Sequence, residues 1–204
     1  MKTAILIDGS FLKAKFREQN SRYPTATDVL DICRKGILEH RCVAGDTLYR
    51  VFFYDCPPFK GYVTDPVSYD AQDYSNTPSA VAQERFLAEI ATRENFCLRT
   101  GEIAYYGWKV HSSVVQDIAA NQKAIDAEHL SHDFQQKQVD VMIALDLARL
   151  ALRRQVDKVV LIAGDSDFIP ALRFARDEGL QVYIAPMGHY IRQPMLESCD
   201  GLII

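Results

Sequence analysis

Two short apolar runs, each followed at once by an aspartate or a glycine, constrain the fold of this chain most strongly. Residues 3–7 lead directly into Asp8, and residues 159–163 lead into Gly164 and Asp165. Runs that are apolar throughout, without alternation, are typical of strands buried on both faces of a sheet. Because predicted helices separate these strands along the chain, we expect an α/β fold with a central, mainly parallel sheet and helices on both faces.

The other predicted elements fit the same architecture. Apolar spacing and capping residues predict helices at 11–19, 28–40, 79–94, 113–135, 137–153 and 168–178. Further strands are expected at 48–54, 181–185 and 202–204, with a strand-rich stretch at 96–110 that breaks at Gly107. Pro, Gly and Asn residues indicate a loop at 57–80. We therefore expect a single domain over 1–204, with a less typical insert at about 57–134.

Charge and composition exclude several classes of protein. The chain has 204 residues, 23 of them Lys or Arg and 27 Asp or Glu, so its formal net charge is −4. This excludes a globally basic nucleic-acid-binding protein, but not a local cluster of carboxylates around a cation. No apolar stretch approaches the roughly 20 residues of a membrane span, so we expect no membrane association. The five cysteines are scattered and form no C-x-x-C pair, which favours reduced thiols in a cytoplasmic protein.

Four carboxylates are predicted to share one site. Asp8 follows the first buried strand, and Asp165 and Asp167 follow the second. If these strands are neighbours, they lie about 4.8 Å apart and their carboxyl ends face one crevice. Asp140 shares a face of the helix at 137–153 with apolar residues, where an unpaired carboxylate is costly. Several ionised carboxylates at one point need a cation, and oxygen ligands favour Mg²⁺ or Mn²⁺.

Each of these carboxylates also has a purely structural interpretation. Asp165 and Asp167 could cap the helix that follows them, and Asp8 could form a turn with its own backbone. Asp140 could pair with Lys137 at the surface. The order strand–Asp, helix–Asp and strand–Gly-Asp-Ser-Asp is harder to explain in these separate ways. We therefore favour a metal site, where a bound ion orients phosphates and activates water.

The motifs around the carboxylates match a known pattern. Ile-Asp-Gly-Ser at 7–10, Lys-Gln-Val-Asp at 137–140 and Gly-Asp-Ser-Asp-Phe at 164–168 together resemble the NYN domain, in the LabA/DUF88-like branch of the PIN-like nuclease superfamily. The resemblance is strongest over 1–55 and 135–204. It implies a PIN-like three-layer α/β fold and a Mg²⁺- or Mn²⁺-dependent endoribonuclease, in which metal-activated water attacks the scissile phosphate of RNA. The resemblance assigns the catalytic and metal-binding roles to four residues: Asp8, Asp140, Asp165 and Asp167.

One position departs from the family pattern. Family sequences usually read D-G-x-N-L after the first strand, whereas this chain has Phe11 at the place of the Asn. Ser10 is the candidate to supply the polar contact instead. Asp146 also matches a family position, but it lies on a different helical stripe from Asp140 and ranks below the four. The departure leaves the acidic set whole and keeps an alternative open: a catalytically weak or inactive NYN-domain module that binds RNA or regulates.

Single-stranded RNA is the predicted partner. Lys137, which flanks Asp140, is expected to contact phosphate, and Ser10 and Ser166 are expected to bind RNA as polar groups. Further basic candidates are Lys13, Lys15, Arg17, Lys60, Lys109, Arg173 and Arg176. The aromatic residues concentrated in 54–108 are expected to anchor loops rather than to stack bases. A homodimer formed through 57–134 is left open.

Overall fold

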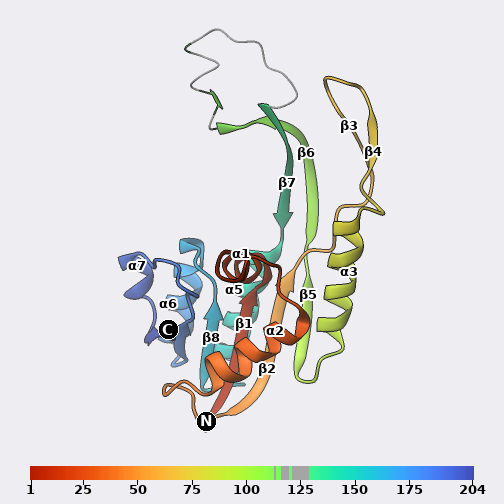
Figure 1. The fold of residues 1–204 in the computed structure, drawn as a ribbon. Helices are drawn as coiled ribbons and strands as arrows, with labels where there is room; N and C mark the ends of the chain where they lie inside the picture. Colours follow the sequence, from red (N-terminus) through yellow and green to blue (C-terminus); the bar gives the residue numbers. More distant parts are fainter. Residues whose placement is uncertain (113, 116–119, 121–128) are drawn as a thin grey trace. The chain divides into compact units, whose positions relative to one another are not determined.

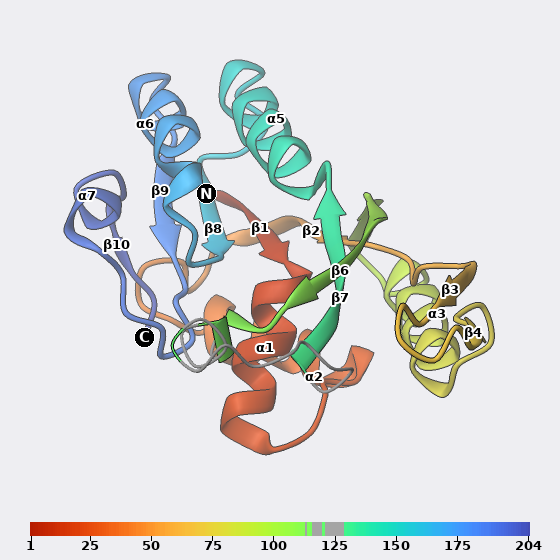
Figure 2. The same ribbon diagram turned by 90° about the horizontal axis from the view of Figure 1, so that it is seen from above.

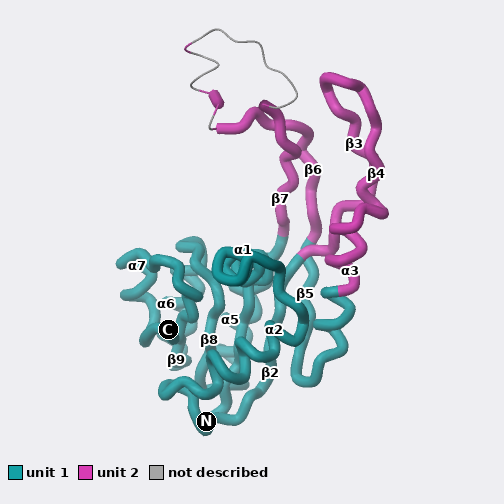
Figure 3. Tube along the Cα trace, in the orientation of Figure 1, with its two compact units in different colours: residues 1–55, 86–101, 138–204 teal, residues 56–85, 102–137 magenta. Residues whose placement is uncertain are grey.

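The structure, a computed structural model, describes residues 1–112, 114–115, 120 and 129–204. The chain divides into two compact units, coloured separately in Figure 3. Unit 1 combines Met1–Asp55, Phe86–Gly101 and Gln138–Ile204, and unit 2 combines Cys56–Arg85 and Glu102–Lys137. Residues 86–101, inside the segment that the sequence marks as an insert, thus belong to unit 1.

A six-stranded sheet, parallel throughout, forms the centre of unit 1 (Figure 1). Its strands, in spatial order, are β10 (Gly201–Leu202), β9 (Gln181–Ile184), β8 (Lys158–Ile162), β1 (Lys2–Asp8), β2 (Thr47–Asp55) and β5 (Phe96–Thr100). The chain builds from β1 through β2 to β5 and then returns to β8 on the other side of β1. The boundary between β1 and β8 is therefore the topological switch point, where ligands of such sheets bind beside the carboxyl ends of the strands.

Helices cover both faces of this sheet, as Figure 2 shows from above. One face carries α1 (Gly9–Asn20), α2 (Ala26–Asp31) and a π-helix (Ile32–Leu38), and the other carries α5 (Val139–Leu152) and α6 (Ile169–Asp177). On the first face, Ile5 and Ile7 of β1 join one buried core with Leu12 and Val29. The structure also describes α3 (Pro78–Ala91), a 3-10 turn (Ser166–Phe168) and α7 (Gln193–Leu196). These three layers confirm the predicted α/β fold.

The predicted position of a strand break in the middle of the chain is wrong in detail. The break in the stretch 96–110 falls at Gly101, between β5 and β6 (Glu102–Val110). Gly107 lies inside β6, with a φ of +96°, where the register shifts between Tyr105 and Trp108. A glycine there lets one strand bulge without ending it.

Unit 2 also contains more strand than expected. The predicted loop at 57–80 holds a hairpin of β3 (Tyr62–Thr64) and β4 (Ala71–Asp73). The end of the helix expected at 113–135 is instead β7 (Leu130–Lys137), which pairs antiparallel with β6, while much of that helix lies outside the described residues. Leu130, His132 and Phe134 alternate with polar residues, and this period of two is the strand signal that the helix prediction overlooked.

An aromatic cluster holds the two strand pairs of unit 2 together. Its rings, in edge-to-face and tilted contacts, belong to Phe59, Tyr74, Tyr105, Trp108, His132 and Phe134. The hydroxyl of Tyr74 lies 2.5 Å from Nε2 of His132, and the indole of Trp108 donates to the carbonyl of Thr64 at 3.1 Å. Of the aromatic residues in 54–108, Phe59, Tyr74, Tyr105 and Trp108 thus have the predicted packing role. Tyr62, Tyr69 and Tyr106 do not, since they are largely exposed.

Two further observations concern the whole described chain. Among the described residues, no helix is long and apolar enough to cross a membrane. None of the five cysteines forms a disulfide, as the sequence predicts, and burial raises the pKa of Cys33 to about 12.

Candidate active site: an acidic crevice at the switch point

Asp8 is the last residue of β1 and the N-cap of α1. Its Oδ1 accepts hydrogen bonds from the backbone N–H groups of Ser10 (3.0 Å) and Phe11 (3.1 Å) and from the Ser10 hydroxyl (2.7 Å). The residue is 8 % exposed. Burial raises its pKa above the ordinary range against the opposing effect of these bonds, and the nearby charge of Asp55 raises it further.

Gly9 allows the chain to turn directly from β1 into α1. A Cβ atom at this position would lie 2.7 Å from the backbone oxygen of Tyr54 and 3.0 Å from a carboxylate oxygen of Asp55. Since such separations are not tolerated, only glycine lets the helix begin this close to the end of β2. The position thereby fixes where the Asp8 carboxylate is presented.

Asp165 follows β8 and lies at the same edge of the sheet as Asp8. Leu6 and Ile7 of β1 pair with Leu161 and Ile162 of β8, so the two buried runs are neighbours, as predicted. Asp165 caps the short 3-10 turn, with its Oδ1 accepting from the backbone N–H of Asp167 at 2.9 Å. The structural interpretations of Asp8, as a turn with its own backbone, and of Asp165, as a cap, are thus both confirmed, and the same hydrogen bonds hold the two carboxylates at the switch point.

Asp140 is the predicted site carboxylate that a helix supplies. It lies in the first turn of α5 and is solvent-accessible. Its pKa is raised, first by partial burial and then by the negative charges of Asp8, Asp165 and Asp167. The other three predicted carboxylates therefore all lie within electrostatic reach of Asp140, and the four residues are called the acidic cluster below. The alternative ion pair of Asp140 with Lys137 is not formed in the part of the chain that the structure describes.

The four carboxylates lie near one another, but their side chains do not surround a common point. In the described ranges, no three Asp, Glu, His or Cys side chains are arranged so that they could hold a metal ion. The chemistry of the set nevertheless suits a hard divalent cation, because every donor is a carboxylate oxygen. The caps of Asp8 and Asp165 use only Oδ1, so neither cap occupies the second oxygen.

Asp146 has a different role from the acidic cluster. It accepts a hydrogen bond from the Tyr54 hydroxyl (2.9 Å) and ion pairs with Arg99 (3.1 Å) and Arg149 (2.7 Å). Both guanidinium groups lie over the ring of Phe52. Every charge in this network is paired, so Asp146 joins α5 to β2 and β5 and is committed to structure.

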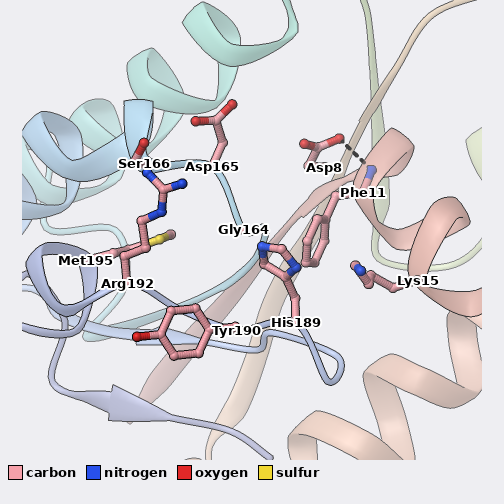
Figure 4. A pocket seen from close by; sticks show the side chains of 10 residues that line it. All are labelled: Asp8, Phe11, Lys15, Gly164, Asp165, Ser166, His189, Tyr190, Arg192 and Met195. Carbon is pink, nitrogen blue, oxygen red and sulfur yellow. Dashed lines mark hydrogen bonds between the residues drawn. The ribbon is translucent and has the colours of Figure 1, made fainter. Parts of the chain in front are cut away.

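A pocket of about 410 Å³ opens beside Asp8 and Asp165 (Figure 4). Its other walls come from α1, from the turn after β8, from the loop after β9 and from α7. Those walls consist of Phe11, Lys15, Gly164, Ser166, His189, Tyr190, Arg192 and Met195. No sequence motif pointed to residues 189–195 as part of the site. Their position just after a buried strand, whose carboxyl end faces the crevice, is the feature that could have indicated them.

Most of the basic residues proposed as phosphate contacts are engaged elsewhere. Lys13 pairs with the buried carboxylate of Asp55 at 2.6 Å, and Arg176 pairs with Asp200 at 3.2 Å. Arg173 donates to the Ser198 hydroxyl at 3.0 Å. In unit 2, Lys60 and Lys109 pair with Glu84 and Asp133. Of the group, Lys15 alone lines the pocket.

The three residues predicted to bind RNA occupy different places. Ser166 lines the pocket, whereas the hydroxyl of Ser10 donates to Asp8. Lys137 belongs to unit 2, where its ammonium donates to Gln135 at 2.9 Å and lies over the ring of Tyr106.

Fold and site together define the class of protein: a three-layer α/β protein with an acidic cluster at the switch point of a parallel sheet, consistent with a PIN-like fold. The NYN domain family model matches residues 67–204, which is more than half of the chain. The protein therefore belongs to the NYN domain family, and so to the PIN-like nucleases. The matched segment contains Asp140, Asp165 and Asp167, while Asp8 lies before it.

One solved structure supports the fold independently. A protein of unknown function from Vibrio parahaemolyticus is similar with a TM-score of 0.52 over 99 % of this chain and 91 % of that chain. The two share 17 % sequence identity, so the likeness concerns the fold alone. No curated protein matches the sequence.

Proposed function

We propose that this protein is a metal-dependent endoribonuclease of the LabA/DUF88-like branch, acting on single-stranded RNA in the cytoplasm. The observation that carries the proposal is that Asp8 and Asp165 line one pocket at the switch point, with Asp140 and Asp167 in the same acidic cluster. Uncompensated carboxylates destabilise a fold unless a ligand neutralises them. At the switch point of a parallel sheet, a cation that also binds phosphate is the natural ligand.

The four carboxylates would hold Mg²⁺ or Mn²⁺. When bound, such an ion activates water and neutralises charge on the scissile phosphate. In both Asp8 and Asp165, hydrogen bonds of a cap hold one carboxylate oxygen in place. The same cap thereby orients the second oxygen, which would bind the cation. Asp140 and Asp167 are exposed, so their side chains have room to reorient toward a cation. Binding would thus complete an arrangement that the present side-chain positions leave open.

The chain's own residues control the protonation and placement of these ligands. The ionised carboxylate is the form that binds a cation, so the raised pKa values of Asp8 and Asp140 make ligation sensitive to acid. The Ser10 hydroxyl holds Asp8 in place at 2.7 Å. Ser166 and Lys137 remain proposed RNA contacts. Ser10 remains one as well, because a lone pair of its hydroxyl oxygen could accept a hydrogen bond from RNA. A homodimer through 57–134 also stays a proposal.

The direct test is cleavage of a panel of single-stranded, hairpin and duplex RNA with Mn²⁺ or Mg²⁺. We expect Asp140→Asn to lower the rate about a hundredfold or more, since even residues behind metal ligands contribute 10–100-fold. Asp177→Asn, at the end of α6, removes the same charge outside the cluster and is the matched control. EDTA should abolish cleavage in both the wild type and the control. Wild-type rates in Asp140→Asn and Asp165→Asn would refute the proposal.

A non-catalytic RNA-binding or regulatory module is the second candidate. The observation that favours it is that, among the described residues, no three side chains could hold a metal ion as they stand. This candidate predicts RNA binding without turnover at saturating Mn²⁺. Calorimetry separates the two, because the nuclease must bind Mn²⁺ in a manner that Asp165→Asn abolishes.

A further inference from the structure

The acidic cluster accounts for only part of the pocket that it borders. Asp8 and Asp165 lie at one end, and the remaining walls are aromatic and basic (Figure 4). The volume of about 410 Å³ falls within the range of roughly 300–1,000 Å³ typical of small-molecule sites. A site for a metal ion alone needs neither this volume nor these side chains.

Phe11 and His189 form an aromatic wall. Their ring centroids are 5.6 Å apart at an interplanar angle of 83°, in an edge-to-face contact. The two rings meet over Gly164, where a Cβ atom would lie 2.6 Å from each of them. Glycine at this position therefore admits both rings beside the end of β8. Tyr190, which is 79 % exposed, adds a third ring that also lines the pocket.

Two cations line the same space. The guanidinium of Arg192 forms no ion pair or hydrogen bond with any residue that the structure describes, unlike those of Arg173 and Arg176. Figure 4 shows it across the pocket from Phe11. Lys15 pairs at 2.7 Å only with Glu18, whose side chain is 63 % exposed. A guanidinium opposite an aromatic wall is suited to a ligand that carries both a planar ring and an anion.

We propose that this pocket binds one unpaired nucleotide of the RNA strand next to the scissile phosphate. The base lies against Phe11 and His189, and the phosphate of that nucleotide is bound by Arg192. The proposal rests on the proposed function for the identity of the strand. A base can enter only when it is unpaired, so the pocket selects single-stranded over duplex RNA.

Binding is measured by fluorescence anisotropy of a labelled eight-nucleotide single-stranded RNA in EDTA, where the proposed hydrolysis cannot proceed. Phe11→Leu keeps an apolar side chain but removes the ring, and we expect it to weaken binding between about fivefold and a hundredfold. Phe11→Tyr restores the ring and should restore most of the affinity. Thermal unfolding of each variant checks that the fold is intact.

Arg192→Gln tests the phosphate contact. We expect weaker binding and a slope of log Kd against log salt that is lower by about 0.7, the value for one phosphate of a single strand. Arg34→Gln removes a charge from the exposed π-helix, outside the pocket, and should change neither quantity by as much. A matched duplex should bind wild-type protein and Phe11→Leu equally weakly.

The outcomes separate this inference from the proposed function. Unchanged RNA affinity in both Phe11→Leu and Arg192→Gln would overturn the nucleotide pocket, even if Asp140→Asn abolished cleavage. Loss of affinity in both, with no metal-dependent cleavage, would support the pocket and refute the nuclease. Adenosine and uridine monophosphates are tested as competitors. Competition as effective as that of the oligonucleotide would overturn the assignment to an RNA strand, because the pocket would then bind free nucleotides.

Discussion

Asp46 at the amino end of the central sheet and Asp8 and Asp140 at its carboxyl end have opposite electrostatic surroundings. At the amino end, Asp46 accepts hydrogen bonds from the Thr3 hydroxyl (2.8 Å) and pairs with Lys158 (3.0 Å). Burial alone would raise the pKa of Asp46, but these partners hold it below its ordinary value. At the carboxyl end, the pKa values of Asp8 and Asp140 are raised.

This contrast separates charge that is compensated within the fold from charge that is not. A buried carboxylate with a cation beside it is compensated within the fold, whereas one facing other carboxylates is not. The Asp146 network follows the amino-end pattern, although Asp146 lies on the same helix as Asp140. Sequence position therefore does not decide which carboxylate is compensated by cations; its partners in the fold do.

The largest expected effect is a loss of stability when the ion pair of Asp46, at the amino end of the sheet, is broken. Lys158→Ala removes the cation that pairs with Asp46, whose side chain is 8 % exposed. Leaving a buried charge unpaired costs about 3–5 kcal/mol of unfolding free energy. Chemical denaturation should show this loss. Lys35→Ala, which breaks an exposed pair with Asp31, is the control and should cost less than about 1 kcal/mol. Equal losses would show that the amino end is no more dependent on its pairing than the surface.

A second, smaller effect tests whether Asp146 belongs with the structural charges. Tyr54→Phe removes a 2.9 Å hydrogen bond to this carboxylate, and bonds to charged groups contribute about 1.5–3 kcal/mol. We expect reduced stability in denaturation and an unchanged cleavage rate per folded molecule. Tyr23→Phe, at an exposed hydroxyl that accepts from Arg17, should change neither. A lost cleavage rate with full stability would place Asp146 in the active site.

The fold could be predicted because its determinants are local. Five consecutive buried residues in β8 and six in β1 leave no exposed face, which only the interior strands of a covered parallel sheet allow. The switch point then follows from chain order. Asp8, Asp140 and Asp165 were found because each stands at a strand end or helix start that this topology brings to one edge.

The pocket could not be predicted in the same way. Phe11 is an exception to the family motif, and His189 and Arg192 stand in a connection without periodicity. Only the tertiary structure shows that Phe11 and His189 meet over Gly164. The strand β7 was missed for a related reason, since its pairing partner β6 lies about twenty residues away and stabilises an otherwise polar segment.

The third prediction returns to the carboxyl end. Asp8→Asn keeps an Oδ1 acceptor for the α1 cap but removes the buried charge. We expect cleavage to be lost while the unfolding free energy stays equal or rises, since each unit of pKa difference between folded and unfolded protein corresponds to about 1.4 kcal/mol. Denaturation and cleavage are measured on the same preparation. Asp8→Ala, which also removes the cap, should be less stable than Asp8→Asn by about 1 kcal/mol.

The smallest effect is the pH dependence of that stability difference. In the unfolded chain Asp8 and Asp140 ionise around the ordinary value of 3.8, whereas their folded pKa values are raised. Between the two values the folded protein binds more protons, so its stability falls as pH rises through this window and then levels off. Asp8→Asn should lack its share of this decrease, and its stability advantage over wild type should grow with pH across the window.

Added Mn²⁺ sharpens the same measurement. A cation that binds the ionised carboxylates stabilises the folded state, and more so above the raised pKa values than below them. Wild-type protein should therefore recover stability with Mn²⁺ at neutral pH, and Asp165→Asn should not. If instead Asp8→Asn and wild type kept the same difference at every pH, with or without Mn²⁺, Asp8 would be as well compensated as Asp46. The contrast between the two ends of the sheet would then be lost.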